Sequence, residues 1–240
     1  MSTARVAAAP HAHERSEARS RLLGAVLPVV TALSLLGLSL LILLLPVYMH
    51  PALDAAGSAE LLGIGRPEAH ALSDRTVGEL LLGPGTFAFA GPDGQPFYGP
   101  DEVAHMRDVR LVLFGFLTLV LLSVITLAVA LATNWRRAFV WRSVARGGAV
   151  LAMGLLVIGI VALGAFDLMF ELFHRLLFPG GNWAFDPASQ RLVQLYPLGF
   201  WQLTSLALGL LAVGSGVLVW LLGRARAGRL EPPTGVGRGG

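Results

Sequence analysis

Four apolar stretches, each longer than about 18 residues, dominate the alternation of hydrophobic and polar positions along the chain. An α-helix needs about 20 such residues to cross the ~30 Å hydrocarbon core of a bilayer. The pattern therefore predicts an all-α polytopic membrane protein with four transmembrane helices. The predicted spans are at about 22–48, 111–133, 147–166 and 200–222.

The first apolar stretch has to be distinguished from a cleaved signal peptide. It is far longer than the about 7–15 apolar residues of a signal peptide, and no small-x-small cleavage site follows closely. We interpret it as the first transmembrane helix, which ends near Pro46 and Pro51.

Two polar segments between the predicted spans, 49–110 and 167–199, are long. In the first, Ser73 is a candidate cap for a short helix. The residues 86–90 and 95–98 flank a Pro-Asp-Gly turn and predict a β-hairpin. We therefore expect a small mixed subdomain between the first two membrane helices.

The arginines predict how the chain is oriented. All 18 basic residues are arginine; the two chain ends and the loop 134–146 hold twelve of them with three acids, whereas the two long segments hold six with twelve acids. Because basic residues concentrate on the cytoplasmic side, both termini are predicted to be cytoplasmic and both long loops extracytoplasmic. The ends 1–21 and 223–240 are predicted to be disordered tails. Because the arginines are explained by membrane orientation, the pI of about 10.1 does not indicate nucleic-acid binding.

Small residues recur along one face of each of the last two spans. Such stripes let helices approach closely in lipid, or they arise by chance in a chain rich in Ala and Gly. The stripes are Gly148, Ala152, Gly159 and Ala162 in the third span, and Ser205, Gly209, Ala212 and Gly216 in the fourth.

The residue types that are missing restrict the chemistry. The chain has no cysteine and no lysine, and neither Gly-x-Ser-x-Gly nor Ser-x-x-Lys occurs. These absences exclude a cysteine nucleophile and the common serine-nucleophile motifs. A transfer or hydrolysis reaction would take its nucleophile from water or from the substrate.

Two of the six histidines lie on outer extensions of membrane helices. His105 precedes the second span by six residues and His174 follows the third by eight. At 1.5 Å per residue these separations are about 9 and about 12 Å. Spans two and three are joined by a short loop, so we expect them to be antiparallel neighbours and their histidines to meet at one height.

Each of these histidines has an acid one helical turn away. Glu102 and Asp108 flank His105, and Glu171 precedes His174. At this spacing a carboxylate can orient an imidazole and support general acid–base catalysis. The alternative without catalysis is two interfacial histidines in local ion pairs.

The repeated Glu-x-x-His pattern also resembles half of a di-metal site in four-helix bundles. The first and fourth spans supply no further acid, which leaves a mononuclear two-His-one-carboxylate site as the metal alternative. We favour histidine chemistry without a metal or other cofactor.

The Gly180-Gly181-Asn182-Trp183 turn is expected to end the helix that carries His174. Several aromatic residues follow it, and they form either an interfacial aromatic belt or the lining of a headgroup pocket.

These residues resemble the lipoprotein intramolecular transacylases, a family of bacterial four-helix membrane proteins. The family commonly has an acid after the proline that matches Pro197, where this chain has Leu198. One matching block is Glu102-x-x-His105-Met106-x-Asp108-Val109. The other comprises Phe170, Phe173-His174, Leu177-Phe178, Asn182-Trp183, Asp186-Pro187, Leu192, Tyr196-Pro197 and Phe200-Trp201.

The resemblance implies an acyltransferase of the bacterial inner membrane. It would move the sn-2 acyl chain of a diacylglyceryl lipoprotein onto the amine of that lipoprotein's own N-terminal cysteine, giving the lyso form. Its partners would be lipoproteins and membrane lipid, and its site would face the extracytoplasmic side. The alternatives are a metal-dependent membrane enzyme and a non-catalytic envelope scaffold. The oligomeric state is not predicted.

In this interpretation His174 is the general base and His105 stabilises the oxyanion or protonates the leaving glyceryl oxygen, or the two roles are reversed. The predicted substrate contacts are Tyr98, Met106, Phe178, Asn182, Trp183 and Tyr196.

Overall fold

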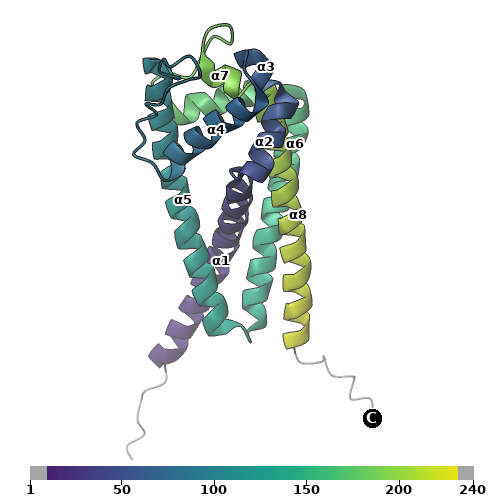
Figure 1. The fold of residues 1–240 in the computed structure, drawn as a ribbon. Helices are drawn as coiled ribbons and strands as arrows, with labels where there is room; N and C mark the ends of the chain where they lie inside the picture. The colour runs from purple at the N-terminus through teal and green to yellow at the C-terminus, as the bar shows by residue number, and fades with distance from the viewer. Residues whose placement is uncertain (1–9, 232–240) are drawn as a thin grey trace, which may run out of the picture.

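The computed structural model describes residues 10–231, with side chains from Ser20 onward. Four long helices run side by side, and four short ones gather at one end of them (Figure 1). The long helices are α1 (Pro10–Leu43), α5 (Pro100–Asn134), α6 (Ala138–Leu177) and α8 (Leu198–Leu230). The short helices are α2 (Pro46–Ala56), α3 (Ser58–Leu62), α4 (Arg66–Leu81) and α7 (Arg191–Leu195). All four long helices are apolar enough to cross a membrane, which confirms the predicted fold class.

Two of the long helices extend beyond the membrane. With 35 residues in α5 and 40 in α6, their lengths are about 52 and about 60 Å, well over the ~30 Å hydrocarbon core. Charged residues mark the parts outside it: five between Asp101 and Arg110 in α5, and three between Asp167 and Arg175 in α6. We therefore place residues 100–110 and 167–177 outside the hydrocarbon core, with the site residues that they carry.

The first and last helices are longer than predicted. The structure has helix from Pro10 and up to Leu230, so the expected tails at 1–21 and 223–240 are helical over those parts. In α8 the reason is continued packing: Gly223 and Ala227 are buried, and Gly223 lies against the backbone of Trp141. The rest of the expected tails, 1–9 and 232–240, lies outside the described residues.

The helix neighbours differ from the prediction. α6 packs mainly on α8 and α1, and α5 packs mainly on α1. α1 lies between α5 and α6, which diverge from their short connection (Figure 1). The prediction that spans two and three are antiparallel neighbours therefore fails over most of their length, because a short loop joins the helix ends without determining what packs between the helices.

The small-residue stripes form a real interface over half their length. Gly148 and Gly216 bring the backbones of α6 and α8 together: a Cβ on Gly216 would lie 2.6 Å from the Gly148 carbonyl oxygen and 3.3 Å from the Ala152 Cβ. Gly159 and Gly209 have no neighbour within 4 Å. The two helices are thus in close contact at one end and separate towards the other.

We call residues 44–99 and 178–197 the cap, which includes the four short helices. A cluster of buried residues holds it together, with Phe87, Phe97 and Leu195 at most 2% exposed. The predicted hairpin is reduced to one antiparallel bridge between Ala90 and Pro96, and no strand occurs among residues 10–231. The first outer segment is therefore helical rather than mixed.

The helix starts in the cap also differ from the prediction. Ser73 does not begin a helix but lies buried in the middle of α4, which starts at Arg66. α1 ends at Leu43, and Pro46 begins α2. Its fixed backbone angle and missing N–H suit the first turn of a helix.

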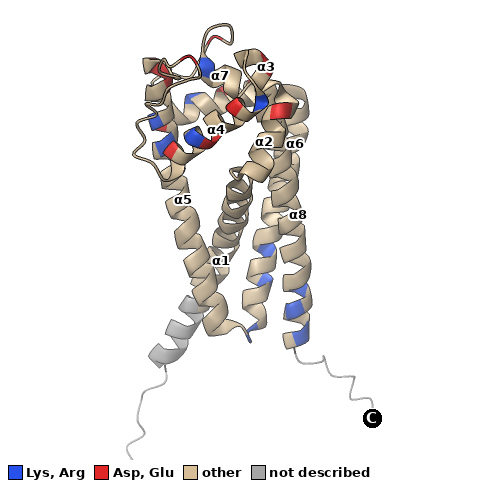
Figure 2. Ribbon diagram, in the orientation of Figure 1, with Lys and Arg blue, Asp and Glu red and all other residues tan. Residues whose placement is uncertain are grey.

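The charged residues divide between the two ends of the bundle (Figure 2). Acids concentrate in the cap and the adjoining helix ends, whereas arginines occupy the start of α6 and the end of α8. This is the segregation on which the orientation prediction rests.

Candidate active site

Glu102 anchors the start of α5 to the cap. Its carboxylate accepts hydrogen bonds of 2.6 Å from the backbone N–H of Gly99 and of 2.6 Å from that of Leu192, and its side chain is 3% exposed. Pro100 occupies the first helical position, where its fixed backbone angle and missing N–H are tolerated. Both carboxylate oxygens are therefore engaged with backbone, so Glu102 fixes the helix that carries His105 rather than the imidazole itself.

A kink in α6 brings the second histidine towards α5. Ala165 has non-helical backbone angles (φ −143°, ψ 37°), and beyond it the end of α6 turns across the bundle towards α5 (Figure 1). His174 lies on this final segment. The two histidines meet because of the kink, although the shafts of α5 and α6 are apart.

His105 and His174 face each other. Their ring centroids are 6.2 Å apart and the ring planes are inclined by 26°. The Phe178 ring borders both, with its centroid 4.8 Å from that of His105 and 5.7 Å from that of His174. His105 is 5% exposed and His174 is half-buried. The two imidazoles thus share one partly enclosed place outside the apolar spans.

The backbone determines the tautomer of His174. Its Nδ1 lies 2.7 Å from the Phe170 carbonyl oxygen. A carbonyl oxygen only accepts, so Nδ1 is the donor and carries the proton. In the neutral ring Nε2 then has a free lone pair, and it is the atom that can act as a base.

Both imidazoles are disposed to be neutral at pH 7. Burial and the neighbouring His174 lower the pKa of His105 to about 4, although Asp108 and Asn182 partly oppose this shift. Burial also lowers the pKa of His174, although its hydrogen bond to the Phe170 carbonyl opposes this effect. A neutral imidazole can accept a proton at one nitrogen while it donates a hydrogen bond from the other.

The glycine turn after α6 brings Asn182 to the pair. Gly181 has a φ of +74°, a conformation that favours glycine. The Asn182 amide nitrogen then donates to Asp108 on α5 at 2.9 Å. Asn182 Oδ1 and His105 Nδ1 are both buried without a hydrogen-bond partner among the described residues. Unsatisfied buried polar atoms are rare, and these two are available to hydrogen-bond to each other or to a substrate.

Aromatic rings surround the histidines. Phe170 and Trp183 lie against His174, with ring centroids at 4.2 and 5.2 Å. Phe185 lies 5.4 Å from His105. Of the predicted substrate contacts, Phe178, Asn182 and Trp183 are therefore at the site.

The other three predicted contacts are not at the site. Tyr98, Met106 and Tyr196 are 3%, 4% and 7% exposed and belong to the core of the cap. The Tyr98 hydroxyl hydrogen-bonds to Thr76 at 2.8 Å and that of Tyr196 to Ser73 at 3.0 Å. The structure encloses these three side chains in the core of the cap rather than beside the histidines, so their contact with a substrate stays a prediction.

The two remaining predicted acids, Asp108 and Glu171, have different partners. Asp108 holds Asn182 and acts on the pKa of His105. Glu171 pairs with Arg175 at 2.5 Å on the exposed side of α6 rather than with His174. Since Glu102 and Glu171 are both engaged elsewhere, the two Glu-x-x-His pairs do not converge on one ligand set. No group of three or more potential metal ligands occurs in the part of the chain that the structure describes.

A second histidine pair was not predicted. His50 and His70 stack with ring centroids 4.2 Å apart. His50 Nε2 lies 2.9 Å from Asp74 and His70 Nε2 lies 2.9 Å from Asp54, which links α2 to α4. The sequence feature that could have predicted this pair is a His-x-x-x-Asp pattern in each helix, which places the histidine and the aspartate on one helix face.

Sequence comparison finds a bacterial relative of this chain. A protein from Aquifex aeolicus (strain VF5), described as uncharacterized, is 30% identical over 132 residues, which are 55% of this chain and 58% of that protein. The chain thus matches little more than half the length of this relative.

Solved structures give the fold. The membrane integral lipoprotein intramolecular transacylase Lit from Bacillus cereus, solved in meso, has a TM-score of 0.73 at 18% identity, covering 89% of this chain and 98% of that one. A structure of a histidine variant of the same protein has a TM-score of 0.68 at 17% identity, covering 91% of this chain and 96% of that one. At these identities the likeness shows the fold alone.

The sequence comparison covers the candidate site itself. Residues 87–201 match the model of the family described as lipoprotein intramolecular transacylase Lit, and this range contains both facing histidines together with Asp108, Phe178 and Asn182. The family resemblance is thereby confirmed: over residues 87–201 this chain carries the sequence pattern of the lipoprotein intramolecular transacylases.

Proposed function

We propose that the protein moves the sn-2 acyl chain of a diacylglyceryl lipoprotein onto the α-amino group of that lipoprotein's own N-terminal cysteine. The ester bond to the glyceryl oxygen breaks and an amide bond forms. The proton lost by the amine ends on the glyceryl oxygen, so the reaction is an isomerisation with no further reactant. The family match over the site residues supports this reaction class.

The observation that carries the proposal is the pair of facing imidazoles with His174 fixed by the Phe170 carbonyl. His174 Nε2 accepts the proton that the amine loses when it attacks the ester carbonyl. It then returns this proton to the departing glyceryl oxygen. A positioned base of this kind typically contributes about 10²- to 10⁴-fold in rate.

His105 has the complementary role. Because burial keeps its ring neutral, it offers an N–H hydrogen bond to the oxyanion of the tetrahedral intermediate. A donor in an enclosed site stabilises developing charge more strongly than the same donor in water. Its buried Nδ1 and the nearby Asn182 Oδ1 are the polar atoms that substrate would satisfy.

The chemistry fits a chain without a cysteine or lysine nucleophile, because the substrate supplies the amine. An α-amino group has an ordinary pKa of about 7.7–8.0, so an adjacent base assists the transfer at neutral pH. The aromatic rings around the histidines provide an apolar place for the ester end of an acyl chain.

The location follows from charge segregation. We infer a bacterial cell-membrane protein with both termini cytoplasmic and the site on the extracytoplasmic face, because the arginine-rich ends of α6 and α8 lie opposite the cap (Figure 2). In that orientation the lipoprotein's acyl chains can stay in the outer leaflet while the headgroup end reaches the histidines.

The test is expression in a host whose lipoproteins remain diacylated, followed by tandem mass spectrometry of N-terminal lipopeptides. Acyl migration leaves total mass unchanged, so fragmentation must locate a chain on nitrogen. We expect N-acylated, lyso-form termini. Unmodified termini in cells that contain the inserted protein would contradict the proposal, and loss of activity with chelator would favour the metal alternative.

A further inference from the structure

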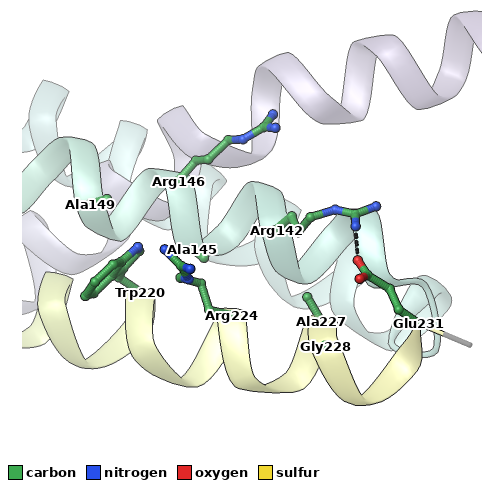
Figure 3. Close-up of a pocket in the computed structure, with 9 residues that line it drawn as sticks. All are labelled: Arg142, Ala145, Arg146, Ala149, Trp220, Arg224, Ala227, Gly228 and Glu231. Atoms are coloured by element: carbon green, nitrogen blue, oxygen red, sulfur yellow. Dashed lines mark hydrogen bonds and ion pairs between the residues drawn. The ribbon is translucent and has the colours of Figure 1, made fainter. Parts of the chain in front are cut away.

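A cavity lies at the end of the bundle opposite the histidines. It has a volume of about 360 Å³ and lies between the first turns of α6 and the last turns of α8 (Figure 3). Its floor consists of the small residues Ala145, Ala149, Ala227 and Gly228. Because these positions carry no large side chain, a hollow remains between α6 and α8 where their charged ends reach the membrane surface.

Arginines surround this hollow. Arg142 and Arg146 on α6 and Arg224 on α8 all line it, with the Arg224 side chain lying toward Trp220 and the Arg146 side chain directed away from Arg224 (Figure 3). Arg224 lies over the Trp220 ring with its guanidinium carbon 5.2 Å from the ring centroid. Trp220 also lines the cavity and suits the boundary between lipid and water.

The charges in the cavity are not balanced. Arg142 forms an ion pair with Glu231, the one acid in the lining. Neither Arg146 nor Arg224 has a carboxylate partner among residues 20–231. The lining therefore carries a net positive charge, and a phosphate group matches the planar, multidentate donors of a guanidinium group.

The cavity is also continuous with lipid-facing helix surface. Val150 lies one turn from Arg146 on α6, and Leu221 lies one turn from Arg224 on α8. They are 65% and 51% exposed, as expected of side chains against acyl chains. A ligand with a phosphate beside long hydrocarbon chains meets both the arginines and this apolar surface, whereas free phosphate meets only the arginines.

We propose that this cavity binds the phosphate of an anionic membrane phospholipid, whose acyl chains lie along α6 and α8. Basic pockets between helix ends at the membrane surface have the charge and shape for such headgroups. The bound lipid joins α6 to α8, two helices that are in close contact at Gly223 and Gly148, and so stabilises the bundle far from the histidines.

The test measures thermal unfolding of the full chain in a nonionic detergent against lipid concentration. The probes are phosphatidylglycerol, phosphatidylcholine with the same acyl chains, and inorganic phosphate. Phosphatidylglycerol should raise the unfolding temperature in a saturable way and the other two should not. Equal effects of both lipids, or an equal effect of inorganic phosphate, would overturn the proposal.

The double variant R146Q/R224Q should bind phosphatidylglycerol more weakly by about tenfold for each arginine removed. The matched control is R136Q/R137Q, which removes two exposed arginines at the same end of the bundle but outside the cavity. It should retain the wild-type lipid response. An equal loss in both variants would show general surface attraction and contradict a site.

Glu231→Gln provides a test in the opposite direction. It frees Arg142 from its ion pair and should strengthen binding of phosphatidylglycerol. Unchanged or weaker binding in a folded Glu231→Gln protein would contradict the assignment of the cavity.

Discussion

The hydrogen bond from His174 Nδ1 to the Phe170 carbonyl selects the tautomer that the proposed mechanism requires. In many enzymes a carboxylate does this and also favours the charged imidazole. A neutral carbonyl supports the charged ring less than a carboxylate would, and burial lowers the pKa of His174 despite this hydrogen bond. His174 therefore combines a defined geometry with a neutral resting state.

The coupling of the two imidazoles can be measured. Because the neighbouring His174 lowers the pKa of His105, His174→Asn should raise the pKa of His105 towards, but not above, its ordinary value of about 6.5, since burial remains. NMR titration of labelled histidine in detergent measures this. An unchanged or lower pKa in the variant would contradict the electrostatic contact.

Glu102 should affect stability more than chemistry. Glu102→Ala removes the acceptor for two backbone N–H groups and should cost about 1–3 kcal/mol in the free energy of unfolding. Asp101→Ala, at the neighbouring exposed position, should cost less than about 1 kcal/mol. Thermal unfolding of both proteins measures the difference, and equal losses would contradict the anchoring role.

Sequence spacing identified the histidines but not their supporting partners. A separation of three residues allows Glu102 to reach His105 and Glu171 to reach His174, yet it equally allows the contacts with Gly99 and Arg175 that the structure shows. Local spacing cannot decide which partner an acid takes, because tertiary neighbours such as Leu192 compete for it.

At the level of helices, the kink at Ala165 decides whether a site exists. The straight parts of α5 and α6 lie on different sides of α1. Only the segment after the kink returns to α5. No proline marks this bend in the sequence, so the helix lengths could be predicted but the turn of the final segment could not.

Two glycines on α8 should respond in opposite ways to the same change. Gly216→Ala places a Cβ against the Gly148 carbonyl and should destabilise the protein by about 1–3 kcal/mol. In Gly209→Ala the new Cβ has no neighbour within 4 Å. Because alanine loses less conformational entropy than glycine on folding, this change should stabilise the protein by about 0.5–1 kcal/mol. Unfolding in detergent checks both signs, and destabilisation by Gly209→Ala alone would contradict this packing.

For the whole molecule, the two ends of the bundle serve different needs. The cap fixes the start of α5 and holds the glycine turn beside the histidines, while the arginine-rich end anchors α6 and α8 at the other membrane surface. The length of the apolar stretches was enough to predict the four spans and the all-α class from the sequence. The helical cap did not, because its core joins residues from 49 to 200 that no local pattern connects.

The absence of cysteine makes the orientation directly testable. A single cysteine at the exposed Ala188 of the cap should react with a membrane-impermeant maleimide in intact spheroplasts. One at the exposed Ala225 of α8 should react only after permeabilisation. Labelling in the reverse order would place the histidines on the cytoplasmic side and contradict the proposed access to lipoproteins.

The central claim concerns His174, and the rate of acyl migration in a synthetic diacylated lipopeptide, followed by fragmentation mass spectrometry, tests it most directly. Glu171→Gln, one turn away on the exposed side of α6, is the matched control and should stay within a few-fold of wild type. His174→Ala should lower the rate by about 10²- to 10⁴-fold. A folded His174→Ala protein that transfers the acyl chain at the wild-type rate would contradict the account.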